Sequence, residues 1–392
     1  MYNSILSPRT LFIIIWALVL SLLEMQLTNN IDLSNWIPFI PIYLLLTVCI
    51  IWSLVRFSIV YSKTGNINIS KPAPLDDYKI ESLKKYATYF FRGWAFLALL
   101  DFAYSGGFPL LRFVLGQPVD YANTGIPTIK GFEYTLYLLT ISIVGYLWGK
   151  IELFPKWIVF LLCIFPVVMF SRATMMYGII QFFISFLFFK KIRLKHFFYA
   201  LVLILGIILL FGIIGDNRGE YANPFSYLIT DKPDNPLNRL PSGFTWIYIY
   251  ITCGYNNILV TYSNLHPTYE LLSVFYNIIP GFLKQALSVK ANSEMVFDES
   301  LNVSSFFSGY IEAFGIIGGI MGGFVLLFLA GLFYNKAKKK GVWYFIGYST
   351  MSSCIILSPF FDALMTVSTV FQLIICLLLS VKFKFPKYEN RK

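Results

Sequence analysis

The chain has 392 residues, of which 57% are hydrophobic, 19% are aromatic and only 13% are charged. Soluble globular proteins carry about 25% charged residues, so this composition excludes a soluble enzyme. The mean hydropathy of +0.68 agrees with an integral membrane protein. Repeated apolar runs are long enough to cross a hydrocarbon core of about 30 Å as helices, and the sequence therefore predicts an all-α polytopic fold rather than a β-barrel.

Basic residues are in excess, with 31 Lys and Arg against 20 Asp and Glu and a net charge of +11. In a soluble protein this excess would suggest nucleic acid, but here most of the basic residues lie just beyond apolar runs. Positive charge in short loops keeps those loops in the cytoplasm. We therefore expect the charge to set the membrane orientation, and we expect no nucleic-acid partner.

The apolar runs, taken in chain order, predict ten transmembrane helices. They cover residues 10–27, 37–55, 87–104, 132–148, 157–170, 173–189, 197–214, 306–333, 342–360 and 363–381. The first run is interpreted as a retained helix rather than a cleaved signal peptide. The positive-inside rule then places both termini in the cytoplasm and makes the chain a single transmembrane domain, 1–392, with a cytoplasmic loop at 63–86.

Two of these helix pairs depend on predicted turns. A single helix from 157 to 189 would be about 50 Å long, too long for a bilayer, and basic residues flank both of its ends. The chain must therefore turn near Ser171 and Arg172. The same reasoning places a second turn at 358–362 on the outer side.

The largest polar region, 215–305, forms one large periplasmic or extracellular loop in this topology. Two moderately apolar pieces lie within it, at 244–262 and 271–289. They suit re-entrant or interfacial helices, because non-helical backbone at membrane depth must be covered by protein or line a cavity. A paired crossing by both pieces, which would give twelve transmembrane helices, keeps the same orientation and stays open.

The outer end of the seventh run carries the most informative charged segment. Arg218 lies there between Asp216 and Glu220, followed by Tyr221. A guanidinium group binds phosphate oxygens through a planar fork of donors, and flanking carboxylates hold it in place, so this segment is a candidate diphosphate site. The alternative is a solvated loop in which Arg218 pairs with one of the two acidic residues.

Two further basic positions are candidates for the same chemistry. Arg172 lies in a turn that is recessed toward the membrane, where an arginine is costly unless it faces a wet cavity or a charged partner. Snorkelling toward the headgroups is the alternative. Arg239, with Lys232 nearby, lies in a Pro-rich stretch, where the alternative is again a solvated loop.

Acidic residues in or beside the predicted helices gather toward the outer ends, as Glu24, Asp101, Glu133, Glu312 and Asp362. Glu312 stands out, because it lies inside an apolar stretch and must pair or line a cavity. His266, in the outer loop, is a candidate general base, although a lone loop histidine is often incidental.

Cofactor motifs are missing from the sequence. The five cysteines are scattered, without CxxC or other metal spacing, and there is no HExxH, DxD, P-loop or Gly-rich nucleotide motif. We expect no disulfide, no metal and no cofactor. The glycines between 315 and 323 form overlapping GxxxG spacings, which predict close helix packing.

The segment 304–319, SSFFSGYIEAFGIIGG, resembles the late segment of the Wzy-type O-antigen and capsular polysaccharide polymerases. In that family an Asn/Ser/Thr-rich stretch is followed by an aromatic residue, an acidic residue and Phe-Gly-hydrophobic-hydrophobic-Gly. The Ser171-Arg172 turn between two hydrophobic arms is similar as well, and Asn217-Arg218-Gly219 lies where the large outer loop of the family begins. The regular Arg-containing repeats described for some members are not evident in this loop.

The resemblance implies a GT-C-like membrane glycosyltransferase in the bacterial cytoplasmic (inner) membrane. Such an enzyme polymerises undecaprenyl-diphosphate-linked oligosaccharide repeat units at the outer leaflet into O-antigen or capsule and releases undecaprenyl diphosphate, without metal or nucleotide. Its partners would be the lipid-linked donor and acceptor, the bilayer and a chain-length regulator protein.

The same resemblance suggests roles for the candidate residues. Arg172 and Arg218 would bind the diphosphate, with Arg239 as a third ligand, and Glu220, Glu312 or His266 would orient or deprotonate the acceptor hydroxyl. Lys232, Asp216 and Tyr221 complete the expected substrate-binding set. The alternative functions are an O-antigen ligase-like glycan transferase, a flippase or transporter of lipid-linked oligosaccharide, and a structural membrane subunit.

Overall fold

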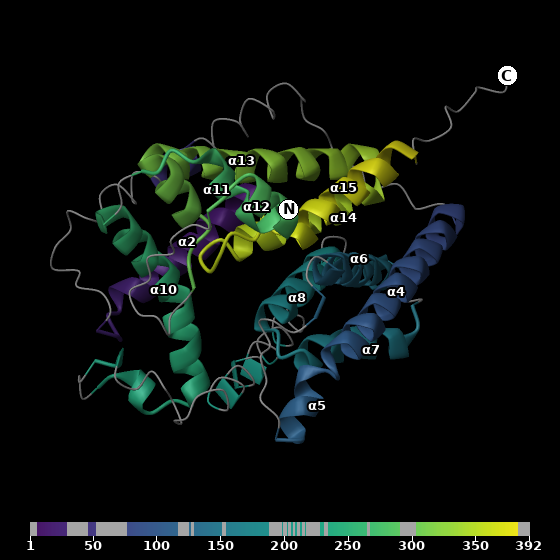
Figure 1. Ribbon diagram of the computed structural model, residues 1–392, viewed down its shortest axis with the longest axis horizontal. Coiled ribbons are helices and arrows are strands. Elements are labelled where there is room, and N and C mark those ends of the chain that lie inside the picture. Colours follow the sequence, from purple (N-terminus) through teal and green to yellow (C-terminus); the bar gives the residue numbers. More distant parts are fainter. Residues whose placement is uncertain are drawn as a thin grey trace. The chain divides into compact units, whose positions relative to one another are not determined.

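The computed structural model (Figure 1) describes residues 6–29, 46–51, 77–116, 125–126, 129–150, 154–187, scattered positions from 198 to 216, 228–230, 234–264, 267–290 and 303–382. Within these ranges no β-strand forms, and one isolated antiparallel bridge joins Thr28 to Ile229. The predicted all-α class is therefore confirmed for the described part of the chain.

The chain divides into two compact units. The first comprises Met1–Ile67, Lys190–Phe328 and Cys354–Thr366, and the second comprises Asn68–Phe189, Leu329–Ser353 and Val367–Lys392. One long helix, α13 (Ser308–Lys340), begins in the first unit and ends in the second. That both units form a single transmembrane domain stays a prediction.

Helices of the second unit follow the predicted runs, except α5, which lies outside every predicted run. They are α4 (Asp77–Ser105), α5 (Pro109–Val114), α6 (Ile129–Lys150), α7 (Lys156–Val168), α8 (Arg172–Leu187), α14 (Val342–Ile356), of which the last three residues belong to the first unit, and α15 (Val367–Lys382). The turn predicted near Ser171 and Arg172 is confirmed, because α7 ends three residues before Ser171. Helix α4 begins earlier than predicted, so residues 77–86 of the expected cytoplasmic loop are helical.

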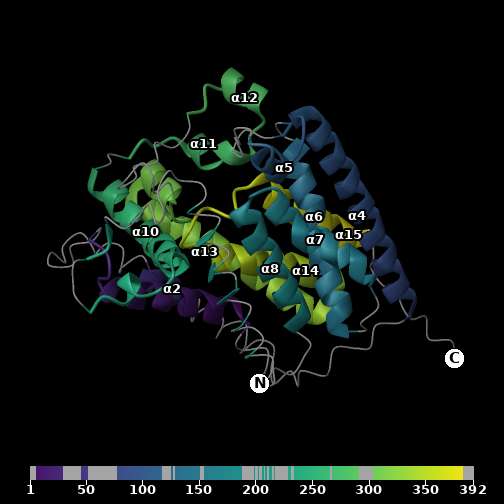
Figure 2. The same ribbon diagram turned by 90° about the horizontal axis from the view of Figure 1, so that it is seen from below.

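Two glycines let α6 and α8 approach each other at backbone distance. A Cβ atom on Gly145 would lie 2.6 Å from the carbonyl oxygen of Phe182, and one on Gly149 would lie 2.9 Å from that of Phe186. Figure 2 shows the two helices side by side. This small-xxx-small spacing is typical of helix contacts in membranes, where close packing replaces the hydrophobic effect as the driving force.

Polar side chains connect the helices inside the second unit. The Ser142 hydroxyl of α6 donates to Gln181 Oε1 of α8 over 2.8 Å, and Gln181 Nε2 donates to the Ser353 hydroxyl of α14 over 3.2 Å. The Thr350 hydroxyl of α14 donates to Gln372 Oε1 of α15 over 3.0 Å. All five residues are fully buried. Hydrogen bonds between helices of this kind stabilise helix bundles in lipid.

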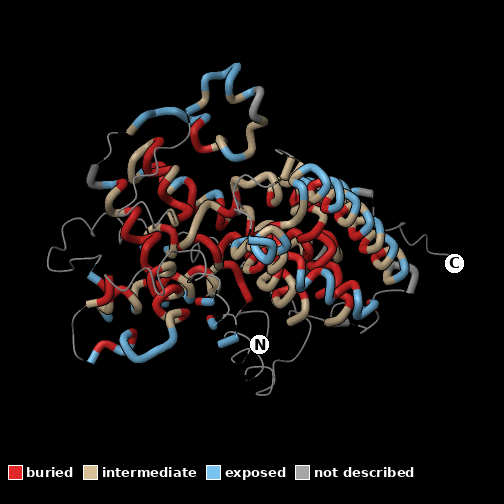
Figure 3. The backbone as a smooth tube through the Cα atoms, turned by 60° about the horizontal axis from the view of Figure 1, so that its bottom comes forward, coloured by how far each residue is buried: buried red, intermediate tan, exposed pale blue. Residues whose placement is uncertain are grey.

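Large apolar side chains of the second unit face outward instead. Figure 3 shows exposed positions along the helices that alternate with buried ones, and the most exposed apolar residues include Phe96, Leu99, Trp157, Phe160 and Leu378. Among the described residues, two stretches are long and apolar enough to cross a membrane, Ile80–Val114 and Ser308–Ala337, and three shorter helices are also apolar. The structure thus agrees with a helical membrane protein, while the number of transmembrane helices stays a prediction.

The first unit contains α2 (Pro8–Glu24), the 3₁₀ helix η3 (Pro236–Asn238), α10 (Ser242–Asn264), α11 (Leu271–Val274), the 3₁₀ helix η4 (Tyr276–Ile278), α12 (Gly281–Ala286) and the first part of α13. The piece predicted at 244–262 forms α10. The piece at 271–289 is divided into three short helices, of which the longest has 6 residues and a length of about 9 Å. None of the three can cross a bilayer, which favours interfacial helices over a paired crossing.

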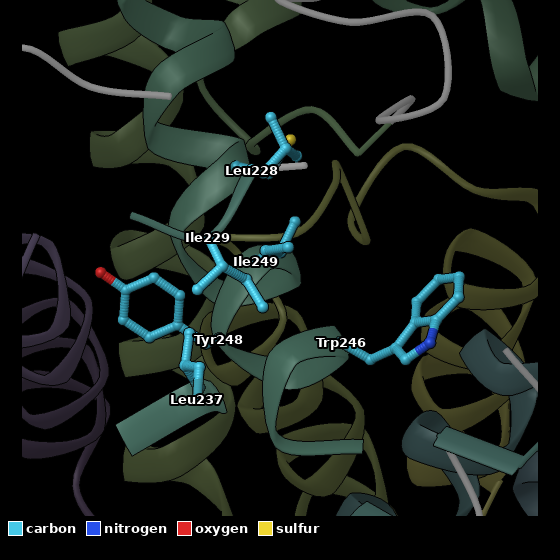
Figure 4. Close-up of a cluster of buried hydrophobic side chains, with 7 residues drawn as sticks. Leu228, Ile229, Leu237, Trp246, Tyr248 and Ile249 are labelled. Carbon is cyan, nitrogen blue, oxygen red and sulfur yellow. The ribbon is translucent and has the colours of Figure 1, made fainter. Parts of the chain in front are cut away.

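A cluster of buried side chains holds α10 against the end of α2 (Figure 4). The Tyr248 hydroxyl donates to the Leu22 carbonyl over 2.9 Å and accepts from the Leu27 N–H over 3.1 Å. Ile229 and Leu237 pack beside Tyr248, whereas Trp246 projects from the other side of α10 in Figure 4. The segment before α10 is therefore folded onto the end of α2.

We expect Gly145→Ala to destabilise the second unit by about 1–3 kcal/mol, because the new methyl group would push α8 away from α6. Gly331→Ala is the matched control, since a Cβ atom at Gly331 in α13 has open space and alanine favours a helix by about 0.5–1 kcal/mol. Thermal unfolding in detergent measures both variants. Equal midpoints would contradict the close α6–α8 contact.

Candidate functional site

Helix α13, which carries most of the segment 304–319 (the motif), is interrupted near its start. All of its backbone angles are helical except at Phe314, with φ −137° and ψ 21°, and at Gly315, with φ 63° and ψ −159°. A positive φ with an extended ψ is accessible almost only to glycine, because a Cβ atom collides there. The Phe-Gly pair of the motif therefore interrupts the helix.

The part of α13 before the break folds back against the part after it. The Tyr310 carbonyl group occupies the space that a Cβ atom on Gly318 would need, and the Tyr310 ring lies 2.8 Å from the position of one on Gly322. The sequence predicted close packing for these glycines. The structure confirms close packing and shows that the partner is an earlier turn of the same element.

The break frees two carbonyl groups, which another segment then binds. In a continuous helix the oxygens of Glu312 and Ala313 would accept hydrogen bonds from residues 316 and 317. Here the backbone N–H groups of Thr268 and Tyr269 donate to them, over 3.1 and 2.9 Å. Glu312 is only 5% exposed, so the residue lies buried where the broken helix meets the segment 267–269.

Residues just before α13 are tied to α2, α10 and the turn after α14. The Phe306 N–H donates to the Ser358 carbonyl over 2.8 Å, and the Trp16 indole N–H donates to the Ser358 hydroxyl over 3.0 Å. The Asn257 amide donates to the Val303 carbonyl over 2.7 Å. Val303 and Phe306 are thus bound to α10 and to the turn after α14, and α2 binds the same turn, which fixes the start of the broken helix.

Asp362, in the turn after α14, is a candidate acid or base that the sequence did not single out for the site. Its Oδ1 accepts hydrogen bonds from the N–H groups of Leu364 and Met365, over 3.0 and 3.1 Å, and it interacts electrostatically with Tyr310. Burial raises the pKa of the Asp362 carboxyl from 3.8 to about 7, against the lowering effect of these hydrogen bonds. Perturbed pKa values of this kind are frequent at functional sites.

The middle of α10 contributes a second polar group that sequence reasoning left out of the site. Asn256 is 3% exposed, and within the described residues neither its amide nitrogen nor its amide oxygen has a hydrogen-bond partner. Buried polar groups are nearly always bonded to protein or to water, so this amide has capacity for a ligand or a water molecule. The Asn256-Asn257 pair in an otherwise apolar piece was the available sequence signal.

Asp216 is bound to the first turns of α10. Its two carboxylate oxygens accept hydrogen bonds from the Ser242 hydroxyl over 2.5 Å and from the Trp246 indole N–H over 2.8 Å. Gly212 and Gly243 approach each other closely beside this contact. Both oxygens of Asp216 are therefore engaged by protein, and the residue anchors the start of the segment that carries Arg218.

Arg239 lies on the surface just before α10. It is the residue that follows η3. The Asn235 side chain caps the start of η3 by accepting a hydrogen bond from the Leu237 N–H over 3.0 Å. The Asn235 amide also donates to the Leu27 carbonyl over 2.9 Å. This network holds the backbone at Arg239 while its side chain is exposed, which suits a group that contacts a ligand from solution.

The structure separates the predicted site residues of the first unit into two groups. Asp216 and Arg239 lie at the start of α10, whereas the Glu312 carbonyl binds Thr268, four residues beyond its end. The 23 residues of α10 extend over about 34 Å. Asp216 and Arg239 are therefore associated with one end of α10, and Glu312 with the other.

Arg172 belongs to the second unit and begins α8. Ser171 precedes it and caps the helix, accepting from the Thr174 N–H over 3.4 Å. The Tyr134 side chain of α6 lies by Ser171 and Thr174, and its neighbour Glu133 is fully buried. The start of α8 is therefore a polar cluster, and two of the Arg172 guanidinium nitrogens are buried.

Five of the predicted site residues lie outside the described residues: Arg218, Glu220, Tyr221, Lys232 and His266. Among the residues that are described, no group of three or more His, Cys, Asp or Glu side chains could hold a metal ion. Comparisons with protein-family models, with curated proteins and with solved structures found no match.

Gly315→Ala tests the break in α13. We expect a loss of about 1–3 kcal/mol in stability, because alanine is strained at this backbone conformation. Gly331→Ala, in the continuous part of the same helix, should be at least as stable as the parent protein. Thermal unfolding compares the two, and a Gly315→Ala protein as stable as the control would show that residues 314–315 are helical.

Proposed function

We propose that the chain is a membrane glycosyltransferase of the Wzy type, which polymerises undecaprenyl-diphosphate-linked oligosaccharide repeat units at the outer leaflet of the bacterial cytoplasmic membrane. About ten transmembrane helices in a GT-C-like arrangement, with both termini cytoplasmic, form part of the proposal. The observation that carries it is the broken helix, because the interruption falls on the Phe-Gly pair of the motif and leaves Glu312 buried at the junction.

The polar groups around that junction suit glycosyl transfer between lipid-linked sugars. The acceptor hydroxyl oxygen attacks the anomeric carbon of the donor, the bond from that carbon to the diphosphate oxygen breaks, and undecaprenyl diphosphate leaves with the electron pair. A base takes the hydroxyl proton. Glu312 and Asp362 are the proposed bases. Glu312 is buried, and Asp362 interacts with Tyr310, two residues before Glu312.

Cationic groups would bind the diphosphates of the two lipid-linked substrates and, at the donor, would stabilise the negative charge of the leaving group. In the first unit the proposed diphosphate ligands are Arg218 and Arg239, which the sequence groups with Lys232, Glu220 and Tyr221. In the second unit the proposed ligand is Arg172. Asp216 has a positioning role in this proposal, because both of its oxygens are bound by α10. His266, two residues before Thr268 in the sequence, is a further proposed base.

The separation of the two groups along α10 agrees with the shape of the substrates. An acceptor repeat unit has its reactive hydroxyl at one end and its own diphosphate at the other, with the whole oligosaccharide between them. The carboxyl groups near the broken helix would serve the hydroxyl, and the Arg239 end of α10 would bind the diphosphate of the acceptor. The alternative functions are a ligase and a flippase of lipid-linked oligosaccharide.

The test is reconstitution of the purified protein in lipid with a single-repeat undecaprenyl-diphosphate oligosaccharide from its own host, without nucleotide sugar. We expect a ladder of two or more repeats. Glu312→Gln and Arg218→Ala should each lower the rate about a hundredfold or more, while Arg92→Ala, at an exposed position in α4, keeps it. A folded protein that gives no ladder would reject the polymerase, and transfer to another acceptor or movement between leaflets would identify the alternative.

The pH dependence of that rate tests Asp362. With a pKa of about 7, the carboxyl is protonated below neutrality and ionised above it, so a rate that needs Asp362 as a base should rise between about pH 6 and pH 8. Asp362→Asn should lower the rate and remove this rise. Glu24→Gln, at an exposed carboxyl of α2, is the control and should keep the parent profile.

A further inference from the structure

The segment 267–290, here called the arm, is built almost entirely of short turns and helices with exposed apolar side chains. It contains α11, η4 and α12, of 4, 3 and 6 residues. Tyr269 is 74% exposed, Leu271 58% and Leu287 54%. Side chains of this kind cost free energy in water, so a surface of several of them indicates a partner.

The arm is amphipathic as well as apolar. Leu287, the residue after α12, donates its N–H to the Leu283 carbonyl over 2.9 Å, so it lies one turn from Leu283, whereas Gln285 lies about 200° from Leu283 around the helix. The Lys284 ammonium group lies 3.7 Å from the centre of the Tyr276 ring, and Lys290 is exposed. Leucines beside tyrosines and lysines are the usual composition of segments that lie in the headgroup region of a bilayer.

The position at which the arm is attached points to the same partner. Its Thr268 and Tyr269 N–H groups bind the carbonyls of Glu312 and Ala313, near the beginning of Ser308–Ala337, which is long and apolar enough to cross a membrane. The end of such a helix lies at the level of the headgroups. Two exposed side chains just beyond the break, Ile317 at 69% and Met321 at 56%, give this end of α13 an apolar surface of its own.

We propose that the arm binds the lipid surface of the leaflet next to the broken end of α13, with Leu271, Leu272, Leu283 and Leu287 among the acyl chains and Lys284 and Lys290 at the headgroup phosphates. The proposal rests on the membrane placement of α13 in the proposed function and is independent of the glycosyl-transfer chemistry.

Membrane binding of the arm has a consequence for the site. The two hydrogen bonds from Thr268 and Tyr269 fix the arm to the backbone of Glu312 and Ala313. The depth of the arm in the leaflet therefore sets the depth of Glu312 relative to the headgroups. The diphosphate of a lipid-linked sugar lies at the level of the headgroups. The arm would therefore hold Glu312 at a constant distance from that diphosphate along the membrane normal.

The depth of individual side chains tests the proposal directly. Cys163 is the exposed native cysteine and the other four are buried, so Cys163→Ser provides a background for labelling. Leu283→Cys, Leu287→Cys and Leu272→Cys, each carrying a nitroxide, are reconstituted in vesicles of phosphatidylcholine and phosphatidylglycerol. Power saturation then compares collisions with oxygen, which concentrates in the acyl region, and with a water-soluble nickel chelate.

We expect the three leucine positions to collide more with oxygen and several-fold less with the nickel chelate than Gln285→Cys, the matched control on the opposite face of α12. Nickel accessibility at the leucine positions equal to that of Gln285→Cys would overturn the proposal. Labels shielded from both reagents would also overturn it, because protein rather than lipid would then cover the arm. Neither readout requires the ladder assay, so the two proposals can fail separately.

Discussion

Backbone groups that are removed from water must keep hydrogen-bond partners, and this requirement determines the contacts around the break in α13. Gly315 makes the interruption possible, and the interruption leaves the carbonyls of Glu312 and Ala313 without their helical donors. The N–H groups of Thr268 and Tyr269 replace those donors. A local feature of the backbone thus joins the segment 267–269 to the motif and leaves Glu312 buried at their junction.

The interior of the second unit follows the same principle with side chains. Gln181 bonds to Ser142 and to Ser353, which brings polar contacts into an otherwise apolar interior, while other leucine and phenylalanine side chains are exposed. In a soluble protein such exposed apolar side chains would cost free energy in water. In lipid the outward leucines cost nothing, and polar contacts and glycine contacts such as Gly145 against Phe182 hold the helices together.

The described charged residues of the proposed site in the first unit lie at the two opposite ends of α10. Asp216, held by Ser242 and Trp246, and Arg239, held through η3, belong to its beginning. Glu312 belongs to the segment beyond its end. An enzyme for small substrates would need these groups within a few ångströms of one another, whereas a lipid-linked oligosaccharide is itself long enough to contact both.

Composition and periodicity alone determined the helical class, the positions of most helices and the turn at Ser171, because apolar runs and basic flanks are local properties of the chain. Local patterns also marked Glu312 and the glycines as unusual. Only the tertiary structure decided that Gly315 breaks its helix, that Asp216 is bound by Trp246, and that Asp362 lies by Tyr310. The last two findings depend on contacts between residues far apart in the sequence, and the first depends on the backbone angles of one residue. A hydrophobic pattern contains no information on such contacts or angles.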